Sequence, residues 1–119
     1  MKYLVFIALI SIVFIQGCYY DNKDLLDPAT CDTTFVTYSA SVNPVLTAYC
    51  VGCHAGANAP LGVSLDTYSG VKTQAFNGKL FGTINHSSGF IPMPKNGNKL
   101  SDCNIAKIRV WIAAGAPNN

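Results

Sequence analysis

The chain has 119 residues, of which half are hydrophobic and only 12% are charged, with a formal net charge of +2. This length supports one compact domain and is too short for two domains with separate cores. The small net charge excludes a strongly basic nucleic-acid-binding surface. The chain contains no glutamate and two histidines, which leaves little material for acid–base catalysis, so we do not expect an enzyme.

Residues 1–17 have the composition of an export signal. Lys2 precedes an apolar run from Tyr3 to Ile15 that only Ser11 interrupts. A helix of this length covers roughly 20 Å, less than the ~30 Å hydrocarbon core of a bilayer, so we expect a signal peptide rather than a permanent membrane span. Residues 15–18, Ile-Gln-Gly-Cys, resemble the lipobox of bacterial lipoproteins, which implies acylation of Cys18. An ordinary signal, with Cys18 as an incidental thiol, is the alternative.

Residues 18–34 are expected to form a flexible tether between this lipid and the folded part of the chain. They carry four aspartates against one lysine and show neither a helical nor a strand period, which is typical of a solvated linker. Residues 35–119 then form the domain. The predicted location is the periplasmic side of a bacterial cell envelope, with the protein attached to a membrane through Cys18.

The most informative motif for function is the segment Cys50-Val51-Gly52-Cys53-His54. This spacing is the signature of covalent c-type haem attachment, in which two thiols bond to the porphyrin and the histidine binds the iron. A thioredoxin-like redox pair does not require His54 and is expected after a strand, whereas the segment before Cys50 is helical in pattern. A zinc site needs a second pair of ligands at matched spacing. We therefore predict one covalent haem c on Cys50 and Cys53, with His54 as the proximal iron ligand.

A second iron ligand is suggested by elimination. Met1 belongs to the signal, which leaves Met93 as the one thioether available to the domain. It lies between Pro92 and Pro94, which fix the backbone and favour a stiff loop. His86 is a rival ligand that would lower the potential of the iron. A third alternative is an iron whose sixth position is open. A fourth is that Met93 binds no iron and only fills space in the core.

With these residues the chain resembles a small monohaem class I c-type cytochrome. The likeness rests on Cys50, Cys53 and His54, on Met93-Pro94, and on a last helix that ends in Trp111-Ile-Ala-Ala-Gly-Ala-Pro117. It implies an all-α cytochrome c fold, with three to five short helices around one haem, and the function of a one-electron carrier between redox partner proteins. A haem-based sensor or weak peroxidase, with an open or displaceable sixth site, is the alternative function.

The helices can be predicted from periodicity and capping residues. An apolar stripe that begins at Val42 predicts a helix over 41–50, followed by a loop over 51–61. Asp66 or Thr67 caps a short helix through Val71, and residues 78–84 form another turn. Residues 89–98 form the loop of Met93. Ser101 caps a last helix that ends before Gly115, crosses the first helix and turns Trp111 towards the haem.

Two cysteines remain after the anchor and the haem pair are assigned. Cys31 and Cys103 can form a disulfide in an oxidising compartment, and two buried thiols are the alternative.

Four of the lysines fall between positions 72 and 99, in a stretch that contains no acidic residue. If Lys72, Lys79, Lys95 and Lys99 surround the exposed haem edge, they steer docking to an acidic partner protein, although ordinary solvation explains them equally well.

Overall fold

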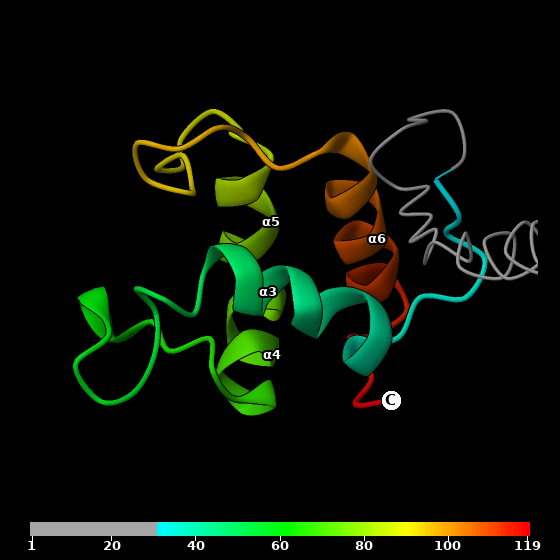
Figure 1. Ribbon diagram of the computed structural model, residues 1–119, viewed down its shortest axis with the longest axis horizontal. Coiled ribbons are helices and arrows are strands. Elements are labelled where there is room, and N and C mark those ends of the chain that lie inside the picture. Colours follow the sequence, from blue (N-terminus) through cyan, green and yellow to red (C-terminus); the bar gives the residue numbers. More distant parts are fainter. Residues whose placement is uncertain (1–30) are drawn as a thin grey trace, which may run out of the picture.

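The computed structural model describes residues 31–119, and within them it consists of helices and loops with no strand (Figure 1). The elements in chain order are a π-helical turn η2 (Tyr38–Val42), α3 (Asn43–Tyr49), a 3-10 turn η3 (Pro60–Gly62), α4 (Tyr68–Phe76), α5 (Lys79–Ile84) and α6 (Asp102–Ala113). The predicted all-α class is confirmed for this part of the chain. The predicted signal peptide, Cys18 and the tether up to residue 30 lie outside the described residues.

Side-chain caps begin the helices at the positions that local sequence favours. The Thr67 hydroxyl accepts a hydrogen bond from the Gly70 N–H at 3.2 Å, and the Ser101 hydroxyl accepts one from Asn104 at 3.2 Å. Each cap pairs one of the backbone donors that the first turn of a helix leaves without a partner. The Ser101 cap is confirmed, and of the two predicted candidates Asp66 and Thr67 it is Thr67 that caps α4. Helix α4 continues to Phe76, five residues beyond the predicted end at Val71.

The first helical segment begins earlier than predicted. Thr37 caps it by accepting from the Ala40 N–H at 3.1 Å, and residues 38–42 form the wider π-helical turn, with Val42 N–H bonded to the Thr37 carbonyl at 3.2 Å. The prediction started the helix at residue 41 because Pro44 is typical of a first turn. Pro44 does occupy the first turn of α3, and the π-helical turn precedes it.

A single apolar core connects the helices. It includes Val42 and Leu46 from the first segment, Val71 from α4, Ile84 from α5 and Ile108 from α6. In Figure 1, α6 stands beside α5, and the chain end returns to the start of η2. Two backbone N–H groups of η2 bond to Asn119 at 2.8 and 2.9 Å. The predicted contact between the first and last helical segments is made chiefly through η2.

Trp111 is fully buried in the core. Its indole N–H donates to the Pro117 carbonyl at 2.9 Å, and its ring centroid lies 5.5 Å from that of Tyr38. The Tyr68 hydroxyl donates to the Ala116 carbonyl at 2.8 Å, so both aromatic side chains hold the segment after α6 in place. None of the helices of residues 31–119 is long and apolar enough to cross a membrane.

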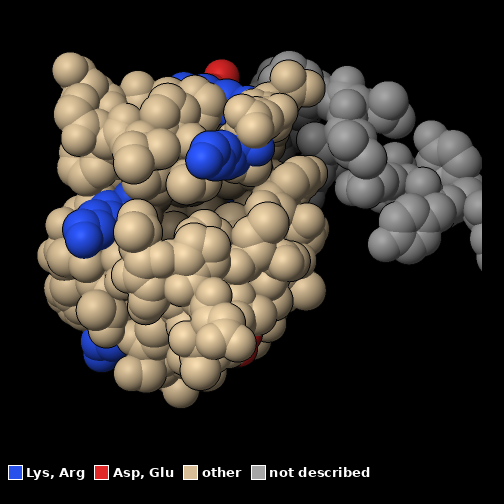
Figure 2. Space-filling model, turned by 90° about the vertical axis from the view of Figure 1, so that its left-hand side faces the viewer, with Lys and Arg blue, Asp and Glu red and all other residues tan. Residues whose placement is uncertain are grey.

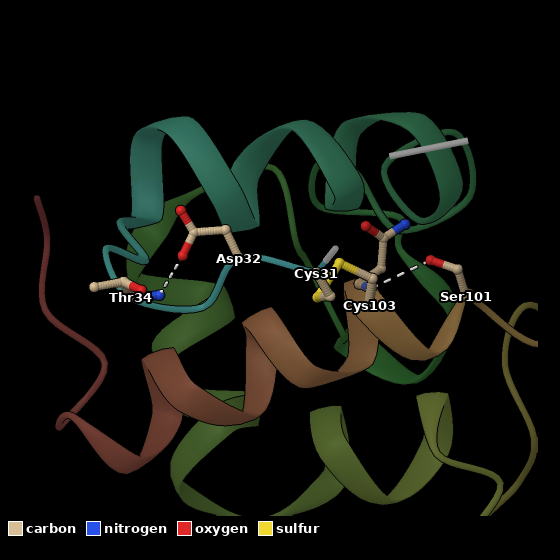
Figure 3. The surroundings of a disulfide bond; sticks show 6 residues. Cys31, Asp32, Thr34, Ser101 and Cys103 are labelled. Carbon is tan, nitrogen blue, oxygen red and sulfur yellow. Dashed lines mark hydrogen bonds between the residues drawn. A yellow bond between two sulfur atoms is a disulfide. The ribbon is translucent and has the colours of Figure 1, made fainter. Parts of the chain in front are cut away.

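The predicted pairing of Cys31 with Cys103 is present as a disulfide (Figure 3). The Cα atoms are 5.4 Å apart, and 72 positions separate the two residues in the sequence. Cys103 lies in the first turn of α6, so the bond attaches residue 31 to the beginning of the last helix. Next to it, the Asp32 carboxylate accepts from the Thr34 N–H at 2.8 Å, which holds the pKa of Asp32 below its usual value.

Removing this disulfide is expected to destabilise the domain substantially. The variant with Cys31→Ala and Cys103→Ala should lose about 2–4 kcal/mol of unfolding free energy, because a long loop in the unfolded chain is no longer closed. Guanidinium denaturation of the whole chain measures the loss. Ser69→Ala, an exposed change on α4, is the matched control, and equal denaturation midpoints for the two variants would contradict the expectation.

Candidate cofactor-binding site

A cavity of about 840 Å³ lies between the segment that follows α3, helix α5 and the loop that follows α5. This volume is within the range of roughly 300–1,000 Å³ that is typical of sites for small molecules and cofactors. In Figure 1 the green and the yellow-orange loops that bound it extend to the same side of the molecule. Its walls are largely apolar, and they include Leu61, Val63, Leu65, Leu80, Ile84 and Phe90.

The residues singled out from the sequence meet in this cavity. Cys50, Cys53 and His54 line one part of it, and Met93, distant in the sequence, lines it as well. His86 is not among the lining residues. Its Nε2 lies 3.1 Å from the Met93 carbonyl oxygen instead. The structure therefore brings together the four predicted donors and holds the rival ligand in a backbone contact.

The turn after α3 positions the two thiols and the imidazole. The Cys50 N–H donates to the Leu46 carbonyl at 2.8 Å, and the Cys50 carbonyl accepts from the N–H groups of Cys53 and His54 at 3.1 and 2.9 Å. This compact turn brings side chains three and four positions apart to one side. Cys50 is half-buried, which raises the pKa of its thiol to about 11, whereas Cys53 is exposed.

The loop that follows fixes the orientation of the His54 ring. The ring Nδ1 lies 2.9 Å from the Val63 carbonyl oxygen, and the His54 carbonyl accepts from the Leu65 N–H at 2.7 Å. A carbonyl can only accept, so Nδ1 carries the proton in this contact, and Nε2 of the neutral ring is left as the basic nitrogen. A histidine held in this way is typical of an iron or zinc ligand.

The exposed side chain of Asp66 holds the two ends of the same loop together. Its carboxylate accepts from the Gly56 N–H at 2.9 Å and from the Ser64 hydroxyl. These hydrogen bonds lower the pKa of Asp66, with the bond from Ser64 contributing most. The carboxylate thus joins the two sides of the segment that presents the Val63 carbonyl to His54.

Substitution of Gly70 should disturb this loop from the side of α4. A Cβ atom at Gly70 would lie 2.2 Å from the Ser64 carbonyl oxygen, which is backbone and must therefore shift. We expect Gly70→Ala to cost about 1–3 kcal/mol of unfolding free energy, as overpacked sites do. Thermal denaturation checks the change, with the adjacent Ser69→Ala as control. Equal stability of the two variants would show that the loop tolerates the added methyl group.

The chain after α5 contributes Met93 to the lining of the cavity. The Met93 N–H donates to the Thr83 carbonyl of α5 at 3.1 Å. Phe90 packs on α5 where Gly82 leaves room, because a Cβ at Gly82 would lie 2.6 Å from the ring atoms. Pro92 and Pro94 on either side of Met93 have no N–H group, so the Met93 N–H is the backbone donor by which this part of the loop bonds to the helix.

The four lysines singled out from the sequence do not lie together. Lys79 and Lys95 line the cavity, and Lys99 lines a smaller neighbouring hollow of about 470 Å³. Lys72 lies over the rings of Tyr68 and Phe76, at 5.5 and 5.7 Å from their centroids. Figure 2 shows lysine or arginine side chains beside the hollow on this face. Two of the four predicted lysines therefore lie at the cavity itself.

Trp111 was predicted to lie next to the site and does not. It was expected on the haem side, but it is not among the residues that line the cavity. Its ring packs beside Tyr38, because the chain after α6 returns across that part of the core. Sequence reasoning also missed the Val63 and Thr83 carbonyls, which no side-chain motif indicates. The spacing of Leu80 and Ile84, four positions apart, was a signal for an apolar wall on α5.

The donor set fits a c-type haem. Two thiols, an imidazole with a basic Nε2 and a thioether border an apolar space, which are the groups required for thioether attachment and for His/Met ligation. Within residues 31–119, no three His, Cys, Asp or Glu side chains form a group that could hold a metal ion. A haem iron needs only two protein ligands, because the porphyrin supplies the others.

Comparison with known protein families, with curated proteins and with solved structures finds no match to this chain.

Proposed function

We propose that the protein is a one-electron carrier of the cell envelope that holds one c-type haem in a cytochrome c fold. The observation that carries the proposal is the convergence of Cys50, Cys53, His54 and Met93 on one largely apolar cavity. A CXXCH motif alone indicates the cofactor, whereas a thioether on a separate loop of the same cavity favours a six-coordinate iron. Six-coordinate iron suits electron transfer better than substrate binding.

In this proposal each donor has a distinct role. Cys50 and Cys53 would hold the haem through thioether links, and His54 and Met93 would be its iron ligands. When bound, the haem supplies a one-electron Fe(III)/Fe(II) couple. The Val63 carbonyl keeps the His54 ring in the tautomer that offers Nε2. The largely apolar lining of the cavity, together with a Met ligand, would favour a raised reduction potential.

Carbon monoxide binding separates this function from its rival. The reduced form of a six-coordinate carrier binds carbon monoxide slowly and weakly at neutral pH, because the Met93 thioether must first dissociate from the iron. A sensor or weak peroxidase with an open or displaceable sixth site binds carbon monoxide rapidly and tightly. Stopped-flow mixing of the reduced protein with carbon monoxide is the test, and rapid, tight binding would overturn the carrier proposal.

The proposed location depends on Cys18. If Cys18 carries the lipid, Cys18→Ser should move the protein from the membrane fraction to the soluble periplasmic fraction, because acyl chains contribute about 0.8 kcal/mol for each buried CH₂ group. Cell fractionation with immunoblotting measures the distribution. The variant with Cys31→Ala and Cys103→Ala is the control for loss of a cysteine in itself. An unchanged membrane fraction for Cys18→Ser would show that the lipobox is not used.

The partners are proposed to be redox proteins with an acidic docking face. Lys79 and Lys95 at the cavity support this because opposite charges accelerate encounter at low ionic strength.

A further inference from the structure

The backbone of Met93 is held at both of its polar groups, one by the last turn of α5 and the other by a residue that follows this helix. Its N–H donates to the Thr83 carbonyl at 3.1 Å, and its carbonyl oxygen lies 3.1 Å from Nε2 of His86. Thr83 is in the last turn of α5, and His86 is the second residue after it. The two contacts therefore join the proposed distal ligand to the end of α5 and to the segment directly after it.

The direction of the second hydrogen bond follows from its acceptor. The Met93 carbonyl can only accept, so His86 Nε2 must carry the proton. The residue also adopts a left-handed backbone with φ of 55°, a conformation that costs most residues free energy and that asparagine and histidine visit more often than others. This residue comes two positions after the end of α5, and its ring Nε2 contacts the carbonyl of Met93.

The loop needs such an attachment. Ile91, Pro92 and Lys95 are exposed, and Met93 and Pro94 are only half-buried. Proline on either side of Met93 removes two backbone donors that could have held the loop. A thioether is a weak ligand, so its residence on iron depends on how firmly the loop is held near it.

We infer that His86 is a positioning residue that latches the Met93 carbonyl and so slows dissociation of the thioether from the iron. This inference rests on the proposed function, since it concerns the same iron. In this inference His86 is not a rival iron ligand, because its Nε2 is hydrogen-bonded to the Met93 carbonyl. The latch does not depend on charge, because neutral imidazole with its proton on Nε2 and imidazolium both donate.

Two substitutions separate the hydrogen bond from the bulk of the ring. His86→Asn suits the left-handed backbone but is too short to reach the Met93 carbonyl. His86→Gln places an amide donor near the position of Nε2 and is the conservative variant. The assay is the limiting rate at which saturating imidazole binds to the ferric, haem-loaded protein, which reports thioether dissociation. Met93→Leu provides the rate without a thioether.

The expected result is a limiting rate about five- to tenfold higher for His86→Asn, the effect of losing one ordinary hydrogen bond, and within about twofold of the parent for His86→Gln. Equal rates in the parent and His86→Asn would overturn the latch. Equal acceleration in both variants would overturn it too, because ring packing would then be the cause.

Hydrogen exchange distinguishes failure of the latch from failure of the proposed ligation. The Met93 amide has proline neighbours on both sides, so a peptide over residues 91–95 reports few other amides. Its exchange should be faster in His86→Asn than in His86→Gln. If this difference appears but imidazole binds the parent as fast as Met93→Leu, the latch holds the loop and Met93 is not a ligand. If exchange is the same in both variants, the latch itself is wrong.

Discussion

Replacing Met93 with alanine is expected to abolish the weak far-red charge-transfer band of the ferric protein. That band is the signature of a thioether on ferric haem iron, and Met93 is the one methionine in the described part of the chain. The reduced variant should then bind carbon monoxide rapidly. Loss of the Met ligand should also lower the midpoint potential, by a shift on the order of 0.1 V within the ~0.8 V range that axial ligands span.

Ile91→Ala is the matched control for this change. Ile91 belongs to the same loop, lines the same cavity and is 62% exposed, so its truncation alters the loop without removing a ligand. The far-red band should persist in Ile91→Ala. A band that persists in Met93→Ala, or that disappears equally in both variants, would remove Met93 from the proposed site.

The second large effect is expected for the pair Cys50→Ala and Cys53→Ala. Without either thiol no thioether can form, so acidified acetone should extract all the haem from this variant and none from the parent chain. The domain should also accumulate poorly, because a cavity of about 840 Å³ loses the group proposed to fill it. Empty apolar volume in a core lowers stability steeply.

The variant with Cys31→Ala and Cys103→Ala is the control here, because it removes the same number of sulfur atoms from the disulfide. Haem in that variant should stay resistant to extraction. Haem that is equally extractable from the parent chain would show that Cys50 and Cys53 do not hold it.

Local signals predicted much of the fold. The caps at Thr67 and Ser101 act within three residues of themselves, so they are readable from the sequence. The turn at η2 was missed because its start is set by Thr37, while the apolar stripe begins only at Val42. The disulfide was predicted from the cysteine count, because each other cysteine already had a role.

The four residues that meet in the cavity were singled out from the sequence, whereas the backbone groups that hold them in place were not. Cys50, Cys53 and His54 form a contiguous motif, and Met93 followed by elimination. The carbonyls of Val63 and Thr83, and the contact of His86 with Met93, depend on how two aperiodic loops fold against α5. Trp111 was assigned to the wrong neighbour for a similar reason, since its partner Tyr38 lies 73 positions earlier in the chain.

The most direct test of the central claim is the intact mass of the purified parent chain under denaturing, reducing conditions. A chain with one covalent c-type haem should weigh one haem more than its sequence, and Cys50 and Cys53 should resist alkylation while Cys31 and Cys103 react after reduction. A chain of unmodified mass with alkylated Cys50 and Cys53, from cells that mature c-type cytochromes, would contradict the claim.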